Sequence, residues 1–351
     1  MAKYEIKNGV GIIPEGEIEI PYLAFSNCEE IVSVVIPDSV ITICRGAFRD
    51  ATNLKSVVFG KSVENIEENA FLNCKSLTEV VLPDSLTTIG EDVFHRCNSL
   101  KSVTLSASLS KISNYAFYGA PIESLVIPDS VKKIGECAFF ENHNLKSVVF
   151  GQSLEEIGES AFCGCIGLTE LSLPLSLKKI RNSAFCGCTN LKSVSFPAKL
   201  SEIGDAAFKE CTALSGVVLP EKLKLIDEWA FDKCISLTSI IVPKSVKTIG
   251  TYAFSSCDNL NSISILGPAK ELSRVCYNDP ALENVTLGEG IESISEDSFS
   301  EWVPTGVVTP DGMKMGKVVP IRALKAIKVP TGTVNYYKGI ISQKFHELIV
   351  E

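Results

Sequence analysis

The sequence is poor in the side chains that most often carry out chemistry: its 351 residues include three histidines, two tryptophans and three methionines. No histidine is paired with a serine or cysteine at a catalytic spacing, and no H-E-x-x-H motif is present. A P-loop motif and a G-x-G-x-x-G motif after a strand are also missing, which excludes the common nucleotide cradles. We therefore expect a protein that is not an enzyme and that uses no cofactor and no metal.

Long apolar runs and clusters of basic residues are also missing. No run of 18 or more apolar residues occurs, so no transmembrane helix is expected, and the first 20 residues lack the apolar segment of a signal peptide. The net charge is −9, with an isoelectric point of about 5.1, which argues against nucleic acid or an anionic membrane as partner. With 45% hydrophobic residues the chain can still bury a continuous core.

What the sequence does contain is a repeat marked by phenylalanine. The marked positions are 23 residues apart, except for one step of 22, and they are Phe25, Phe48, Phe71, Phe94, Phe117, Phe139, Phe162, Phe185, Phe208, Phe231 and Phe254. Tyr277 and Phe299 extend the series. Such self-similarity is the signature of a repeat architecture in which each unit buries its apolar face against its neighbours.

One unit, residues 77–99, shows what each position does: it reads L-x-x-V-x-L-P-D-S-L-x-x-I-G-x-x-V-F-x-x-C. The two-residue period of a strand turns Val80 and Leu82 inward and Glu79 and Val81 outward. Pro83 ends the strand because proline cannot donate to the ladder. The stretch before the cysteine is too short for a full helix, so we expect one helical or 3₁₀ turn there.

This unit resembles the BspA-like (Treponema-type) leucine-rich repeat family over about residues 8–300. The resemblance implies a β-rich repeat solenoid, a right-handed leucine-rich-repeat superhelix with a parallel concave sheet and short 3₁₀ or helical turns. It also implies binding roles, including cell adhesion, at bacterial or protist surfaces. We expect a capping repeat at 1–30, tandem 23-residue repeats at 31–300, and an irregular C-terminal cap at 301–351; a small separate domain at 301–351 is the alternative.

Thirteen cysteines would suggest disulfides in a secreted protein, but their positions favour an inward column of reduced thiols. Eight of them follow the repeat aromatic by three residues: Cys28, Cys74, Cys97, Cys165, Cys188, Cys211, Cys234 and Cys257. The Cys163-Gly-Cys165 and Cys186-Gly-Cys188 pairs lie on adjacent units and leave open a zinc site or a Cys163–Cys186 disulfide. Residues two apart on a turn point in different directions, which disfavours the convergence of four thiolates on zinc.

The outward strand face is the most informative surface. One outward column is rich in serine, and the other is mainly apolar. Its members are the candidate partner-binding residues Val35, Val58, Val81, Thr104, Val126, Val149, Val218 and Ile241. Such a column reflects either the strand preference of valine or a contiguous binding patch. Beside it, Lys55, Lys101, Lys146 and Lys192 recur on alternate units, and we expect a solvated rim of alternating charge.

These features favour a monomeric interaction or adhesion scaffold whose partner is a protein, such as a host or extracellular-matrix protein. A carbohydrate-binding surface protein and an intracellular scaffold are the alternatives. For sugar, the strand face lacks tryptophan and tyrosine, leaving only Trp302, Tyr336 and Tyr337. An enzyme would need Asp311 or a lysine in residues 301–323. The resemblance predicts a cell-surface or secreted protein, whereas the cysteines and the missing signal favour the cytoplasm.

Overall fold

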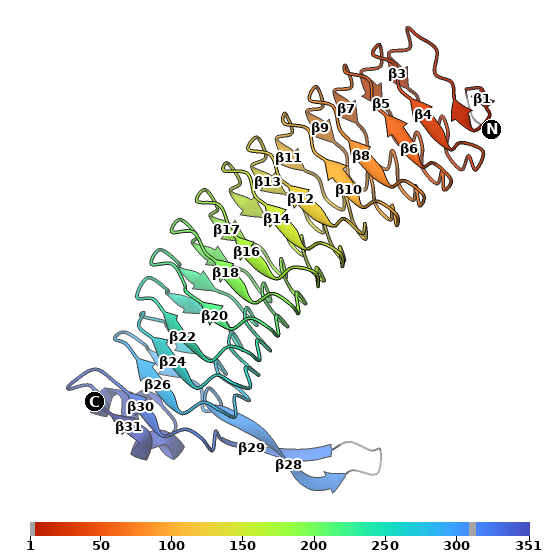
Figure 1. Ribbon diagram of the computed structural model, residues 1–351. Coiled ribbons are helices and arrows are strands. Elements are labelled where there is room, and N and C mark those ends of the chain that lie inside the picture. The colour runs from red at the N-terminus through yellow and green to blue at the C-terminus, as the bar shows by residue number, and fades with distance from the viewer. Residues whose placement is uncertain (1–3, 309–313) are drawn as a thin grey trace. The chain divides into compact units, whose positions relative to one another are not determined.

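The computed structural model describes residues 4–308 and 314–351, so Asp311 lies outside the described residues. The chain forms two compact units, Met1–Leu177 and Lys178–Glu351, and each is described by itself. Both are stacks of short coils in which parallel strands pair from coil to coil (Figure 1). The expected class, a leucine-rich-repeat solenoid of parallel strands, is confirmed.

In the first unit each coil contributes a strand of two or three residues to one face and a two-residue strand to the other. Paired strands of neighbouring coils are parallel and in register, with Ser33 beside Ser56 on the first face and Thr42 beside Asn65 on the second. The first set comprises β2 (Val10–Gly11), β4 (Ser33–Val35), β6 (Ser56–Val58), β8 (Glu79–Val81), β10 (Ser102–Thr104), β12 (Ser124–Val126), β14 (Ser147–Val149) and β16 (Glu170–Ser172). The second set comprises β3 (Glu19–Ile20), β5 (Thr42–Ile43), β7 (Asn65–Ile66), β9 (Thr88–Ile89), β11 (Lys111–Ile112), β13 (Lys133–Ile134) and β15 (Glu156–Ile157).

The second unit repeats this plan. Its first face comprises β18 (Ser193–Ser195), β20 (Gly216–Val217), β22 (Ser239–Val242), β24 (Ser262–Ile265), β26 (Asn284–Leu287), β30 (Ala326–Lys328) and β31 (Ile349–Val350). Its second face comprises β17 (Lys179–Ile180), β19 (Glu202–Ile203), β21 (Leu225–Ile226), β23 (Thr248–Ile249), β25 (Glu271–Leu272) and β27 (Ser293–Ile294).

The repeat phenylalanines form a ladder inside each unit. From Phe25 to Phe162, and again from Phe185 to Phe254, successive rings are 4.9–5.5 Å apart and within 12° of parallel. All of these side chains are fully buried. The expectation that Tyr277 continues the ladder is wrong. The Phe254 N–H bonds to the Val275 carbonyl, as each repeat phenylalanine bonds to the residue before the next, so buried Cys276 holds the position.

The chain after the second strand is neither helical nor 3₁₀ in the described coils, which corrects the expected turn. Two residues per coil, two before and two after the phenylalanine, instead have a left-handed backbone, such as Asn69 (φ 59°) and Asn73 (φ 61°). With this backbone, every second N–H group points at the next coil: Asn69, Phe71 and Asn73 donate to it, and Phe71 N–H bonds to the Val93 carbonyl at 3.0 Å. Gly164 (φ 74°) and Gly187 (φ 70°) hold the second left-handed position, which accounts for the two Cys-Gly-Cys motifs.

The N-terminal end is closed by a hairpin. The strand β1 (Ile6–Lys7) pairs antiparallel with β2, and the two residues between them, Asn8 (φ 55°) and Gly9 (φ 82°), are both left-handed. Asn-Gly favours such a two-residue hairpin turn. The Tyr4 ring then lies 5.6 Å from Phe25 and covers the first ring of the ladder.

The C-terminal region resumes the stack after a hairpin. β28 (Ser300–Val308) pairs antiparallel with β29 (Lys314–Pro320), and the hairpin projects outward from the coils of its unit (Figure 1). At its base, Ile321 N–H bonds to the Phe299 carbonyl at 3.1 Å, so Ile321 takes the place that cysteine has three residues after phenylalanine. β30 and β31 then extend the parallel sheet, with α1 (Val334–Ile340) and the 3₁₀ helix η1 (Gln343–Leu348) between them. Parallel stacking therefore continues to the C-terminal end of the second unit.

Candidate functional site

The candidate residues of the first unit form one continuous row. Parallel pairing in register aligns Val35 with Val58, Val81 with Thr104, and Val126 with Val149. The valines of this row are 54–62% exposed, although valine is usually buried. Val218 (83% exposed) and Ile241 (62%) hold the same repeat position in the second unit.

Ile12 belongs to the same row but was not among the residues predicted from the sequence. β2 pairs with β4 so that Val10 lies beside Ser33 and Gly11 beside Val34, which places Ile12 beside Val35. Its side chain is 41% exposed. The signal was available, because aligning Val10-Gly11-Ile12 with Ser33-Val34-Val35 extends the outward column by one coil. We call Ile12, Val35, Val58, Val81, Thr104, Val126 and Val149 the valine row.

The buried residues next to the valine row in each strand determine that its side chains point to the solvent. Val34, Val57, Val80, Val103 and Leu125 are at most 8% exposed. Successive strand side chains point to opposite faces, so a slip of one residue in any coil would expose this buried set. Stacking of the core therefore holds the apolar row toward the solvent.

Charged side chains border the valine row. Lys55, Lys101 and Lys146 are exposed, as the expected rim requires, and exposed Glu79 and Glu123 lie between them. Beside Val58 and Val81 the surface forms an open depression of about 450 Å³. The row thus combines apolar side chains with charges of both signs.

The cysteine column is a structural element. In six coils the thiol donates to the carbonyl of the phenylalanine in the preceding coil, at 3.2–3.3 Å, as Cys97 does to Phe71. Asn142 holds the same position and donates its amide N–H to the Phe117 carbonyl at 2.9 Å. Burial raises the pKa of Cys97 to about 12. Cys28, at the N-terminal end, is only half-buried.

The two Cys-Gly-Cys motifs belong to different units. Cys163 and Cys165 lie in the first, and Cys186 and Cys188 in the second. Within residues 4–308 and 314–351, no group of three or more His, Cys, Asp or Glu side chains is placed to hold a metal ion. The Cys163–Cys186 disulfide remains an untested alternative.

Aromatic side chains lie along the turns of the second unit rather than on its strand face. The Trp229 and Tyr252 rings stack 5.8 Å apart. Lys209 covers the Trp229 ring at 5.6 Å, and Arg274 covers the Tyr252 ring at 5.7 Å. A sugar platform needs an open ring face, and these faces are occupied by protein groups.

Of the three tail aromatics weighed for sugar binding, Tyr337 is buried and donates its hydroxyl to the Gly288 carbonyl. Tyr336 is 48% exposed, but its hydroxyl donates to the Ile291 carbonyl at 2.6 Å. Trp302, on the hairpin, is 39% exposed. The three do not form one convergent aromatic site with free polar groups.

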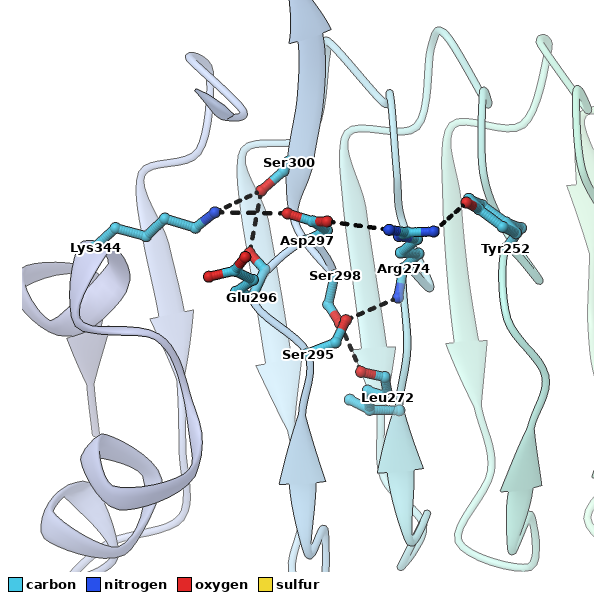
Figure 2. Close-up of polar contacts among 9 residues, drawn as sticks. All are labelled: Tyr252, Leu272, Arg274, Ser295, Glu296, Asp297, Ser298, Ser300 and Lys344. Atoms are coloured by element: carbon cyan, nitrogen blue, oxygen red, sulfur yellow. Dashed lines mark hydrogen bonds and ion pairs between the residues drawn. The ribbon is translucent and has the colours of Figure 1, made fainter. Parts of the chain in front are cut away.

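A polar network joins the C-terminal 3₁₀ helix to the preceding coils (Figure 2). Asp297 lies 3.4 Å from Arg274 and 3.9 Å from Lys344, and Arg274 donates to the Tyr252 hydroxyl at 2.8 Å. Lys344 also donates to the Ser300 hydroxyl at 3.2 Å, a pairing found in serine–lysine nucleophiles. However, Ser300 is fully buried, so no substrate could reach its hydroxyl, and the network serves to anchor the cap.

Comparisons with known proteins agree with this architecture. A family model described as the BspA type leucine rich repeat region (6 copies) matches residues 18–144, 110–234, 139–261 and 178–303. The chain therefore belongs to the BspA-type leucine-rich repeat family. No curated protein matches the sequence.

Two solved structures illustrate the likeness. A leucine-rich repeat protein from Bacteroides ovatus is 25% identical with a TM-score of 0.72, over 95% of this chain and 88% of that one. The pneumococcal vaccine antigen PcpA is 24% identical with a TM-score of 0.58, over 90% of this chain and 78% of that one. At this identity, PcpA supports the fold alone. Within the described residues, every helix is too short or too polar to cross a membrane.

Proposed function

We propose that the protein is a non-catalytic interaction scaffold that binds a protein partner through the valine row. The observation that carries the proposal is the run of exposed valines on consecutive strands, each 54–62% exposed. A contiguous apolar surface on a folded protein is typical of a binding site. Covering one such valine recovers part of the roughly 1.5–3 kcal/mol that full burial contributes.

The partner we propose is a protein rather than a glycan. The valine row offers methyl groups and the hydroxyl of Thr104, whereas sugar recognition needs open aromatic rings with convergent polar groups. The Trp229 and Tyr252 rings on the turns of the second unit are already covered by lysine and arginine side chains. A glycan array with specific hits would favour the carbohydrate alternative.

We place the protein at the cell surface or in secreted form, in line with the roles that its family implies. The high number of cysteines is weaker evidence for a cytoplasmic location than it first suggests. Burial raises the pKa of Cys97 to about 12 and that of Cys211 and Cys257 well above its usual range. Since the thiolate is the reactive form, such thiols persist in an oxidising compartment. Labelling of intact cells with an antibody against the chain would test the location.

The binding test is a pull-down of extracellular-matrix and host-cell proteins with the full chain and two triple variants. The first variant carries Val58→Glu, Val81→Glu and Val126→Glu in the valine row. The control carries Ile41→Glu, Thr87→Glu and Ser110→Glu, which add the same charge at exposed positions of the second sheet. Glu64 already occupies this repeat position, so the control should fold.

We expect the valine-row variant to lose the captured partner and the control to retain it. Loss of binding in both variants would point to a general charge effect. Retention in both would refute the proposed face and direct attention to the turns or the C-terminal cap.

A further inference from the structure

Charged side chains alternate in sign along the edge of the valine row. From β6 to β14, each strand has one exposed charge on this edge: Lys55, Glu79, Lys101, Glu123 and Lys146. Four of them lie directly after the first leucine or isoleucine of the coil, and Glu79 lies one residue further along. None of the five takes part in an ion pair within the described part of the chain. The charges are therefore available to another molecule.

A row of charges that alternates in sign can pair with a second copy of the same row that runs in the opposite direction. Consider a two-fold axis parallel to the strands that passes between β8 and β10 and brings two copies face to face. Lys55 then faces Glu123 of the second copy, and Glu79 faces Lys101 of the second copy. Because the axis repeats each contact, the arrangement forms four ion pairs.

The same axis matches the apolar side chains. It places Val58 against Val126 of the second copy and Val35 against Val149 of the second copy. Val81 then meets the methyl-bearing side chain of Thr104. Sheets that pack face to face lie about 10 Å apart, a distance that valine side chains from both copies can fill.

Other arrangements of two copies either lose apolar contacts or bring like charges together. A shift of the axis by a full strand spacing, to between β10 and β12, keeps opposite charges together but places Val58 opposite Ser172. A shift of the axis by half a strand spacing, so that it passes through β8, places Lys55 opposite Lys101, because the sign alternates from strand to strand. A two-fold axis along the row instead brings Lys55 opposite exposed Lys61, and Glu79 opposite exposed Asp84. Like charges across an interface disfavour the last two arrangements.

We infer that the valine row of one chain binds the valine row of a second copy in this antiparallel register, which makes the protein a weak homodimer. The inference rests on the proposed function in that the same face binds, and it replaces the monomer expected from the sequence. From β4 to β14 the row spans about 24 Å, at about 4.8 Å per strand. A contact this narrow belongs to the small interfaces typical of transient association.

The experiment is sedimentation velocity of the full chain over a wide range of concentration, with charge-reversal variants. Lys55→Glu alone and Glu123→Lys alone each turn two ion pairs into like-charge contacts. We expect each to weaken the dimer about tenfold. Mixing the two single variants restores complementary pairs, as does combining both changes in one chain. Lys111→Glu, on the second sheet, is the control and should dimerise like the original protein.

The outcomes separate this inference from the proposed function. A chain that stays monomeric at every concentration overturns the dimer, even if the pull-down finds a partner. A dimer without rescue in the mixed or doubly changed variants overturns the register. A dimer with rescue supports the inference, whether or not a second protein is captured.

Discussion

Asp279 is a carboxyl group in a position that other coils fill with a hydrogen-bond donor. It lies three residues after Cys276, where six described coils have a donating thiol and Asn142 has a donating amide. Asp279 is fully buried. Its Oδ1 accepts from the Cys257 N–H at 2.6 Å, but its Oδ2 has no hydrogen-bond partner within the described residues. Burial raises the pKa of this carboxyl well above its usual range.

Replacing Asp279 by asparagine should stabilise the protein at neutral pH. The new amide can donate to the Phe254 carbonyl, as Asn142 donates to Phe117. Removing one buried polar group without a hydrogen-bond partner should raise the free energy of unfolding by about 1–3 kcal/mol. A second contribution comes from ionisation, because the unfolded aspartate loses its proton near pH 4 while the buried one retains it.

The sign of the pH dependence follows from the raised pKa of Asp279. A carboxyl that binds its proton more tightly in the folded state contributes its full stability below the unfolded pKa. That stability is lost as the pH rises toward the folded pKa, at about 1.4 kcal/mol per pH unit. The advantage of Asp279→Asn should therefore be smallest below about pH 4 and grow toward pH 7.

The assay is urea unfolding of the original chain and of Asp279→Asn at pH 7 and at acidic pH, followed by tryptophan fluorescence. Because repeat arrays depart from two-state behaviour, the midpoint is compared rather than an extrapolated free energy. Asn142→Asp is the reciprocal control and should lower the midpoint at pH 7. A midpoint difference for Asp279→Asn that does not change with pH would refute the reasoning.

Two further predictions concern single contacts. Gly250→Ala should lower the free energy of unfolding by about 1–3 kcal/mol, because the added Cβ would lie 2.2 Å from the Glu228 backbone nitrogen. Gly216→Ala is the control: no atom lies within 4 Å of the added Cβ, so the stability should stay the same or rise slightly. Thermal unfolding of both variants checks this difference. Asp297→Ala should release Lys344 and speed hydrogen exchange in the C-terminal 3₁₀ helix while leaving the N-terminal coils unchanged; equal exchange in that helix would contradict its anchoring role.

The core and the outward row could be predicted from the sequence because both follow from spacing alone. Phenylalanine every 23 residues fixes which side chains stack, and the two-residue period fixes which point outward. The wrong prediction that Tyr277 continues the ladder shows the limit of prediction from spacing. Cys276 and Tyr277 are neighbours, and only the bond from Phe254 to Val275 decides which of them is buried.

The turns could not be predicted because their residues share no side-chain chemistry. The left-handed position two residues before phenylalanine is occupied by residues as different as Asn69, Tyr115 and Trp229. Left-handed backbone usually favours glycine or asparagine, so the common signal is missing. What holds these residues is the bonding of each coil to the next, a long-range cause that local propensity does not report. The Asn8-Gly9 hairpin, by contrast, carried a local signal that could have been recognised.

The outward valines could reflect either a binding surface or the strand preference of valine, and the serines in the same repeat position help to distinguish the two explanations. Ser172 in the first unit and Ser195 in the second occupy the outward position that valine holds in most coils of the valine row, and both remain within regular strands. The strand is therefore formed with a small polar residue in this position, and the core beneath is just as buried: Leu171 is 3% and Val194 6% exposed. Since the fold does not require valine there, strand preference alone does not account for the exposed methyl groups of Val58 and its neighbours, which supports the proposal that a partner covers them.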